Sequence, residues 1–253
     1  MGASSGFGEA TSLALARAGF DIFGVHLDRR QTMPNVERIR GQITEGGRQA
    51  HFFNINVADA EKRAATLDSM QELCGGQPVR VLLHSVAFGA LKPMIADEPA
   101  NALSQPQIEM TLNVMASSLI YWTQELVQRK LMRDWGRIFA MTSAGSNRAI
   151  ASYGAVSAAK ACLEAYIRQL AVELAPRGIT ANAIRAGVTD TPAARMIPGS
   201  EELFAEAKRK NPAKRLTTPA DVAAFIALMS ASAAHWVSGN VINVDAGEEI
   251  SGA

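Results

Sequence analysis

A serine, a tyrosine and a lysine that could act together lie in the segment MTSAGSNRAIASYGAVSAAKACLEA, residues 141–165. Tyr153 and Lys160 are seven residues apart, about two helical turns, so a helix would present both side chains on one face. Ser143 stands ten residues before the tyrosine, at the end of an expected strand. A phenol exchanges protons near neutral pH only when a nearby cation lowers its pKa, and Lys160 could do that. The pattern predicts acid–base chemistry; a helix cap and a solvated lysine are the alternative interpretation.

The chain opens on MGASSGFG, with glycines at 2, 6 and 8. Small residues let backbone N–H groups approach a pyrophosphate at the start of a helix, where the helix dipole favours negative charge. A helix is expected at 9–19 and a strand at 20–27, which completes a loop–helix–strand unit. The segment predicts a dinucleotide site, although a disordered tail would have the same composition.

Apolar runs alternate with helical periods along all 253 residues. Strands are expected at 20–27, 50–56, 78–87, 136–144, 179–184 and 239–247. Helices are expected at 9–19, 34–46, 59–74, 104–130, 152–175 and 218–230. Continuous apolar strands separated by helices predict a parallel sheet covered on both faces. No linker divides the chain, so we expect one α/β domain, doubly wound, over 1–253.

Composition limits the function classes. Hydrophobic residues make up 48% of the chain and the net charge is +1, which argues against a nucleic-acid or membrane binder. Cys74 and Cys162 fit no zinc or redox spacing, and the histidines show no metal-ligand spacing. With no visible signal peptide, the sequence predicts a cytoplasmic protein without a metal.

Six segments resemble the short-chain dehydrogenase/reductase superfamily in order and spacing, over nearly the whole chain. They are GASSGFG, HSVAFG, LNVMAS, SYGAVSAAKACLEA, GITANAIRAGVTDTP and NVINVDAG. The resemblance implies a Rossmann-type single domain that moves hydride between a nicotinamide cofactor and a carbonyl, alcohol or activated alkene.

One departure from the superfamily pattern indicates a branch. Most members have the pattern Tyr-x3-Lys, with the tyrosine four residues before the lysine. Here Val156 occupies that position, and Tyr153 lies about one helical turn earlier. This Tyr-x6-Lys spacing resembles the enoyl-[acyl-carrier-protein] reductases of fatty-acid synthesis. In ketone reduction, hydride goes to the carbon that bears the oxygen. In enoyl reduction, charge builds on the thioester oxygen, which lies two bonds further from the carbon that receives hydride, so the donor must lie further from the nicotinamide. One helical turn moves a Cα by about 5 Å, which is the right scale.

The resemblance implies roles residue by residue. Tyr153 would stabilise the enolate, Lys160 would hold the ribose, Ser143 occupies the usual catalytic-serine slot, and Asn113 would support a proton-relay water. Cofactor contacts are implied at Gly2, Ser4, Ser5, Gly6, Phe7, Gly8, Asp28, Arg29, Asn56, Val57, Ser85, Val86, Ala87, Lys160, Gly187, Thr189 and Thr191. A substrate flap is expected at 191–211, with an acyl-chain pocket formed by Phe88, Met196, Ile197 and Phe204.

The cofactor and partners follow from neighbouring charges. His26 occupies the slot where NAD-specific relatives have aspartate, and Arg29 and Arg30 follow Asp28, so we expect NADPH, with NADH as the alternative. The basic segment AKRKNPAKR, 207–215, suits an acidic acyl carrier protein, although basic residues also favour a helix end. The substrate would be an enoyl thioester on acyl carrier protein or coenzyme A, and the protein a homotetramer.

Two other activities fit the same sequence. A ketone or hydroxy-group oxidoreductase, of ketoacyl or hydroxysteroid type, is favoured by Asn113 and Ser143. A non-catalytic nucleotide-binding protein is the other alternative. It is favoured by the absence of a strand before the glycine loop. In the family a strand that ends in threonine runs into this loop, and here Met1 stands at the threonine's place. We expect the fold to lack its first strand, either because the chain is truncated or because another segment fills the slot. Truncation predicts that about five to eight added residues would stabilise the protein.

Overall fold

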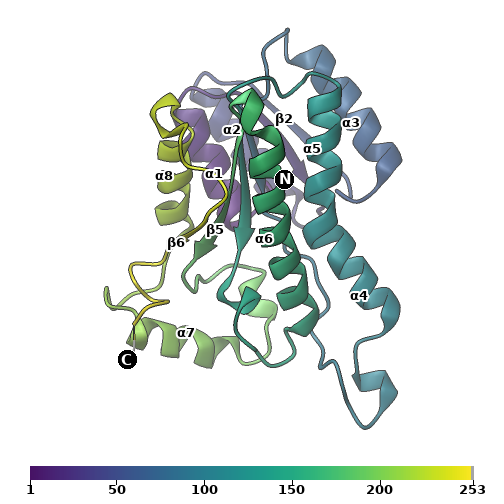
Figure 1. Cartoon of the computed structure of the whole chain (residues 1–253), viewed down its shortest axis with the longest axis vertical. Coiled ribbons are helices and arrows are strands. Elements are labelled where there is room, and N and C mark those ends of the chain that lie inside the picture. The colour runs from purple at the N-terminus through teal and green to yellow at the C-terminus, as the bar shows by residue number, and fades with distance from the viewer. Residues whose placement is uncertain (252–253) are drawn as a thin grey trace.

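Six parallel strands lie between helices in the computed structural model, which describes residues 1–251 (Figure 1). The strands are β1 (Ile22–His26), β2 (Ala50–Asn54), β3 (Val81–His84), β4 (Arg137–Thr142), β5 (Thr180–Ala186) and β6 (Val241–Val244). Each coincides with an expected apolar run. All six residues of β4 are buried, as a central strand covered on both faces requires. The predicted doubly wound α/β fold is confirmed.

The helices are α1 (Gly6–Arg17), α2 (Met33–Glu45), α3 (Ala60–Leu73), α4 (Gln105–Leu112), α5 (Ser118–Gln128), α6 (Gly154–Leu174), α7 (Ser200–Lys210) and α8 (Pro219–Met229). Two features differ from expectation. The helix predicted at 104–130 is divided by a π-helical turn, Asn113–Ser117. The helix α7 lies inside the predicted flap, where acidic residues begin it and basic residues end it, an arrangement that its dipole favours.

The sheet is interrupted between β1 and β3. β1 pairs with β2, and β3, β4, β5 and β6 form a separate ladder. Met1 bridges the two parts: its nitrogen donates to the Leu83 carbonyl at 2.7 Å and its carbonyl accepts from the Ser85 N–H at 3.0 Å. Gly2 N–H donates to the Val25 carbonyl at 2.8 Å. Met1 and Gly2 therefore lie between β1 and β3 and bond to both strands. Figure 1 marks this end of the chain within the body of the fold.

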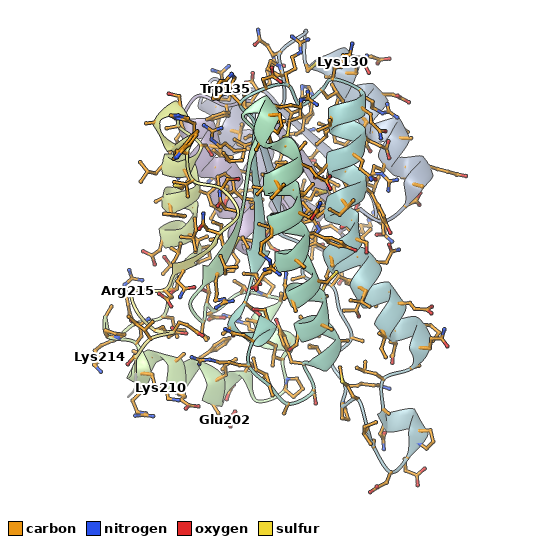
Figure 2. The ribbon with its side chains drawn as sticks, in the orientation of Figure 1. Lys130, Trp135, Glu202, Lys210, Lys214 and Arg215 are labelled. Carbon is orange, nitrogen blue, oxygen red and sulfur yellow. The ribbon has the colours of Figure 1, made fainter. Side chains whose placement is uncertain are left out.

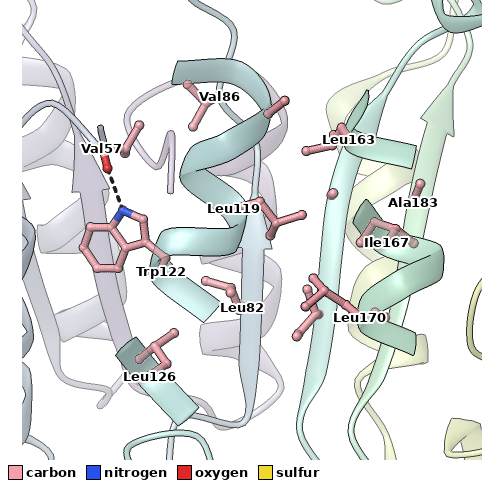
Figure 3. Close-up of a cluster of buried hydrophobic side chains, with 14 of the residues drawn as sticks. Val57, Leu82, Val86, Leu119, Trp122, Leu126, Leu163, Ile167, Leu170 and Ala183 are labelled. Carbon is pink, nitrogen blue, oxygen red and sulfur yellow. Dashed lines mark hydrogen bonds between the residues drawn. The ribbon is translucent and has the colours of Figure 1, made fainter. Parts of the chain in front are cut away.

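The main core packs α5 and α6 against one face of the sheet (Figure 3). Leu119 and Leu163 are fully buried there. The indole of Trp122 is also buried and donates its Nε1–H to the Val57 carbonyl at 2.9 Å. This bond ties α5 to the loop after β2 and satisfies a polar group that burial would otherwise leave unpaired.

Candidate active site

Tyr153 stands at the N-cap of α6, immediately before its first residue Gly154, rather than inside the helix. Its carbonyl accepts the first helical bond from the Ser157 N–H at 2.8 Å, and Ser152 before it has a φ of 59°. The Tyr153 hydroxyl hydrogen-bonds with the side chain of Ser143, which follows β4. A Cβ added to Gly145 would lie 2.7 Å from the tyrosine ring. The structure thus brings the predicted serine and tyrosine together, and Gly145 leaves room for the ring.

Lys160 lies two turns further along α6, with 5% of its surface exposed. Its ammonium donates to the carbonyl of Met141 at 2.7 Å and points to that of Val86 at 3.5 Å. Burial lowers the pKa of Lys160 from 10.5 to about 8, and the carboxylate of Glu164 opposes this shift. Lys160 is therefore held at the carboxyl ends of β3 and β4, where parallel α/β folds bind ligands.

The pKa of Tyr153 differs from the sequence expectation. Burial raises the pKa of this phenol above its ordinary value, and only the hydrogen bond with Ser143 opposes the rise. A lowered pKa caused by Lys160 was expected, but the ammonium is directed at backbone carbonyls instead. Tyr153 is consequently a protonated hydrogen-bond donor at neutral pH, because desolvation disfavours the phenolate.

A buried ion pair supports Lys160, and the motif analysis missed it. Glu164 Oε1 accepts from Thr142 Oγ1 at 2.6 Å and from Arg185 Nη2 at 3.1 Å. The Arg185 and Glu164 side chains are 11% and 12% exposed. Arg185 also donates to Ser146 in the loop between Ser143 and Tyr153. A glutamate one turn after Lys160 was the available signal, because residues four apart share a helix face.

Asn113 begins the π-helical turn and is solvent-exposed. Among residues 1–251, no hydrogen bond joins its side chain to Tyr153, Lys160 or Ser143. His84 holds the other end of the turn, since its Nε2 lies 2.8 Å from Ser118 Oγ. That hydroxyl donates to Val114, so it accepts from His84, which makes Nε2 the protonated nitrogen. Single π-helical turns inside α-helices are frequent at functional sites.

The glycine loop provides a place for a dinucleotide pyrophosphate. A Cβ on Gly8 would lie 1.9 Å from the Gly2 carbonyl oxygen, so only glycine permits this close approach of backbone. Ser5 precedes α1 without capping it. Within residues 1–251, the N–H groups of Gly6, Phe7 and Gly8 have no acceptor. These free donors at a helix start fit an anion.

Asp28 faces this loop from the end of β1. It hydrogen-bonds with Ser4 and Thr32, and its Oδ2 lies 2.8 Å from His26 Nδ1. Burial alone would raise the pKa of Asp28, but these hydrogen bonds outweigh it and lower the pKa. Arg29, like its neighbour Arg30, is exposed. The aspartate is thus an ionised acceptor beside the glycine loop.

The other predicted cofactor contacts surround the same end of the sheet. Val57 and Val86 are buried, Asn56 and Ala87 are exposed, and Ser85 is half-buried. The methyl group of Thr191 lies near Gly6, 3.4 Å from where a Cβ would stand. Thr189 is buried and donates to Gly187. A dinucleotide would therefore find backbone and small side chains on both sides of α1's first turn.

Exposed apolar side chains mark the expected substrate side. Phe88 is 58% exposed and Met196 is 73% exposed, while Ile197 and Phe204 are half-buried. Met94 was missed by the sequence analysis. Its side chain packs beside Gly154, where an added Cβ would lie 2.7 Å from the Met94 methyl group, so it adjoins Tyr153. Its only sequence signal is a Met-Ile pair in the loop before α4.

Glu248 fastens both ends of the predicted flap. Its Oε1 accepts from the Val188 N–H at 2.9 Å, and its Oε2 accepts from the Asn211 side chain at 3.2 Å. Asn211 also donates to the Asp245 carbonyl at 3.0 Å. The two ends of the flap are therefore held close together by the carboxylate of one residue, Glu248.

The basic segment 207–215 surrounds the end of α7 (Figure 2). Part of its charge is already paired: Lys210 lies 2.6 Å from Glu206, and Arg215 binds Asp221 through two hydrogen bonds. Lys208, Arg209 and Lys214 are exposed, and none of the ion pairs within residues 1–251 includes them. Three of the cations are thus open to an acidic partner.

Comparison with known proteins identifies the family. A family model described as Enoyl-(Acyl carrier protein) reductase matches residues 2–249. The chain belongs to this family. It has the short-chain dehydrogenase/reductase fold, and it is an NAD(P)H-dependent oxidoreductase.

Members with different named substrates are similarly distant. The 1-cyclohexenylcarbonyl-CoA reductase of Streptomyces collinus is 27% identical over 251 residues, covering 98% of this chain and 85% of the relative. The 3-oxoacyl-[acyl-carrier-protein] reductase of Pseudomonas aeruginosa is 27% identical over 252 residues, covering 99% and 96%. The enoyl-[acyl-carrier-protein] reductase (NADH) structure from Aquifex aeolicus has a TM-score of 0.84 at 23% identity, covering 98% of this chain and 92% of that chain. Over residues 1–251, no helix of this family member is both long and apolar enough to cross a membrane.

Proposed function

We propose that the chain reduces the 2,3 double bond of an enoyl thioester, carried on acyl carrier protein or coenzyme A, in fatty-acid synthesis. The observation that carries the proposal is the position of Tyr153 at the N-cap of α6, hydrogen-bonded with Ser143 and two turns before the buried Lys160. A donor that stays protonated suits an oxygen that gains negative charge and keeps it through the step.

Each residue has a part that follows from its contacts. The bound nicotinamide supplies hydride to the substrate. Tyr153 donates its hydroxyl hydrogen bond to the thioester oxygen as the enolate forms, and Ser143 orients that hydroxyl. Lys160, fixed by the Met141 carbonyl, is held to bind the cofactor ribose. Glu164 keeps the lysine charged because it opposes the effect of burial on its pKa.

The cofactor is proposed to be NADPH because Arg29 and Arg30 adjoin the ribose end of the site. Asp28 is the group that opposes this choice, since a carboxylate accepts from a free 2′-hydroxyl and repels a 2′-phosphate. Comparing kcat/KM for NADPH and NADH tests the balance. Asp28→Ser should raise the NADPH/NADH ratio, and Arg29→Ser should lower it. If neither substitution changes the NADPH/NADH ratio of kcat/KM, residues other than Asp28 and Arg29 determine the cofactor preference.

The proposed partners also have support in the surface. The exposed cations Lys208 and Arg209 lie near the end of the predicted flap and suit an acidic acyl carrier protein. Leu228 is 69% exposed and Trp236 is 90% exposed, and large apolar side chains of this kind are usual in subunit interfaces, which supports a homotetramer. We include a cytoplasmic location in the proposal, in keeping with the two free cysteines.

A ketone reductase is the second candidate, favoured by the hydrogen bond between Tyr153 and Ser143. Absorbance at 340 nm with NADPH or NADH separates the two when crotonyl-CoA is compared with acetoacetyl-CoA. Oxidation with the enoyl thioester, reduced about 100- to 1000-fold in Tyr153→Phe, would support the proposal. Tyr121→Phe is the matched control, because that ring lies against Arg63. Turnover of the ketone alone would favour the second candidate, and cofactor binding without turnover would indicate a non-catalytic protein.

A further inference from the structure

Two adjacent glutamates in the turn after β6 contact different segments of the candidate active site. Glu248 bonds to both ends of the flap, at Val188 and Asn211. Glu249 contacts Arg148, whose Nη2 donates to the Glu249 carbonyl at 3.0 Å and lies 3.2 Å from Glu249 Oε1. The Glu249 side chain is 17% exposed. One turn of the chain therefore contacts both the flap and the loop that contains Arg148.

That loop, residues 144–152, joins the serine and the tyrosine of the site, and we call it the active-site loop. Its backbone hydrogen bonds are local. Within residues 1–251, the side-chain hydrogen bonds and ion pairs that reach it from elsewhere come from two residues. Arg185 donates to Ser146 at 3.0 Å, and Glu249 binds Arg148. The position of the active-site loop thus depends on Arg185 and Glu249.

Arg185 itself depends on two carboxylates. Its Nη2 donates to Glu164 at 3.1 Å, and its Nη1 lies 4.0 Å from Glu249 Oε1. Its Nε is buried and has no partner among the described residues, and the side chain is 11% exposed. A buried charge that loses one partner is costly. Loss of the Glu249 charge would therefore loosen the active-site loop at both Ser146 and Arg148.

The turn that carries Glu249 is held in an uncommon conformation. Ala246 has a φ of 53° and Gly247 a φ of 82°, and the left-handed region is rare for a residue with a side chain. Asp245 stabilises the turn, because its Oδ1 accepts from the Gly247 N–H and its Oδ2 from the Glu249 N–H, both at 2.9 Å. Strained backbone of this kind clusters at functional sites. The backbone of Glu249 is thus a fixed point from which its carboxylate holds Arg148.

We propose that Glu249 is a positioning residue for Ser143 and Tyr153, and that it keeps them at a fixed distance from the flap that Glu248 holds. The inference rests on the proposed roles of Tyr153 and of the flap. The two carboxylates belong to neighbouring residues of one turn, so the flap and the active-site loop share a single anchor. Reacting groups must stay close and aligned, and a misplacement of about 1 Å can lower a rate about 100-fold. A substrate held by the flap would thus meet the Tyr153 hydroxyl at a constant distance.

Glu249→Gln tests the proposal, because it preserves the shape of the side chain and removes the charge that faces Arg148 and Arg185. The kcat with crotonyl-CoA should fall about 10- to 100-fold. The Kd of the cofactor, which is proposed to bind at the glycine loop, should not change. Glu72→Gln is the matched control, since Glu72 is exposed on α3 and none of the ion pairs within residues 1–251 includes it. A lower Tm with an unchanged kcat would make Glu249 a purely structural residue and overturn the proposal.

Arg148→Gln tests whether the arginine acts through the same contact. The double variant Glu249→Gln/Arg148→Gln should lower kcat no further than Glu249→Gln alone, because the effects of two groups that act through one contact are not additive. If the two losses in kcat instead multiply, the contact between Glu249 and Arg148 does not position the loop, and the proposal is overturned.

Amide hydrogen exchange needs no substrate, so it separates this proposal from the proposed function. In Glu249→Gln the amides of Ser146 and Arg148 should exchange at least about 10-fold faster, and in Glu72→Gln they should not change. If the unmodified protein turns over neither crotonyl-CoA nor acetoacetyl-CoA, the proposed function fails, and the exchange rates alone decide whether Glu249 holds the active-site loop. Unchanged exchange at both amides would overturn the role of Glu249, whatever the activity.

Discussion

Replacing Glu164 by glutamine tests how the site keeps Lys160 charged. The substitution keeps an acceptor for Thr142 and removes the charge that faces Arg185 at 3.1 Å. Hydrogen bonds to charged groups contribute about 1.5–3 kcal/mol each, and both side chains are about nine-tenths buried. We therefore expect a loss of about 2–3 kcal/mol of stability, or a fall of about 4–12 °C in Tm for a chain of this size. The pKa of Lys160 should also fall further below about 8, because the opposing carboxylate charge is gone.

The assay is the pH profile of kcat/KM with the enoyl thioester, which reports groups titrating in the free enzyme. If the lysine must be charged, the alkaline limb of Glu164→Gln should move to lower pH. Glu173→Gln is the matched control, since Glu173 is an exposed residue of the same helix that contacts only Gln169 among described side chains. A lower Tm with an unmoved alkaline limb would refute the electrostatic role and leave Glu164 a purely structural residue.

Three further predictions follow from single contacts. Gly8→Ala should abolish cofactor binding in a fluorescence titration, because its Cβ would meet the Gly2 carbonyl oxygen at 1.9 Å, whereas a Cβ at Gly41 meets nothing within 4 Å and Gly41→Ala should bind normally. Lys160→Met should inactivate the enzyme yet raise its Tm at pH 7. The folded-state pKa of about 8 lies below 10.5, so the native lysine costs about 3 kcal/mol below pH 8. The Tm advantage of Lys160→Met should shrink as pH rises from 8 to 10.5, and an advantage that does not change with pH would contradict this prediction. Trp122→Phe should cost about 1–3 kcal/mol in urea unfolding, because the buried Val57 carbonyl loses its 2.9 Å donor; an unchanged midpoint would mean that water replaces the indole.

The strands could be predicted because each is a continuous apolar run, which depends only on local sequence. The pairing of Ser143 with Tyr153 followed from the spacing of the two around one loop. The ion pair of Arg185 and Glu164 could not be found this way. It depends on the register that sets Thr142 beside Arg185 across β4 and β5, and register is a property of the assembled sheet. The rise in the pKa of Tyr153 was missed for the same reason, because burial is a tertiary effect.

The π-helical turn that divides the helix predicted at 104–130 could also not be predicted from the sequence. The segment contains no glycine or proline after Pro106, so the sequence predicts one uninterrupted helix. The π-helical turn is held by contacts from outside, among them His84 of β3, which donates to Ser118. The helix α7 was missed because the segment around it was assigned to a flap on family resemblance, although its charge distribution was visible.

Glu248 has a consequence for how this enzyme could diversify. Because one carboxylate fastens the chain at Val188 and again at Asn211, the residues between them form a closed excursion from the body of the protein. Changes in length or composition between the two anchor points would leave both bonds to Glu248 in place. If this segment holds the substrate, as proposed, substrate range could change within it while Tyr153 and Lys160 keep their places, which is how loops on rigid scaffolds acquire new specificities.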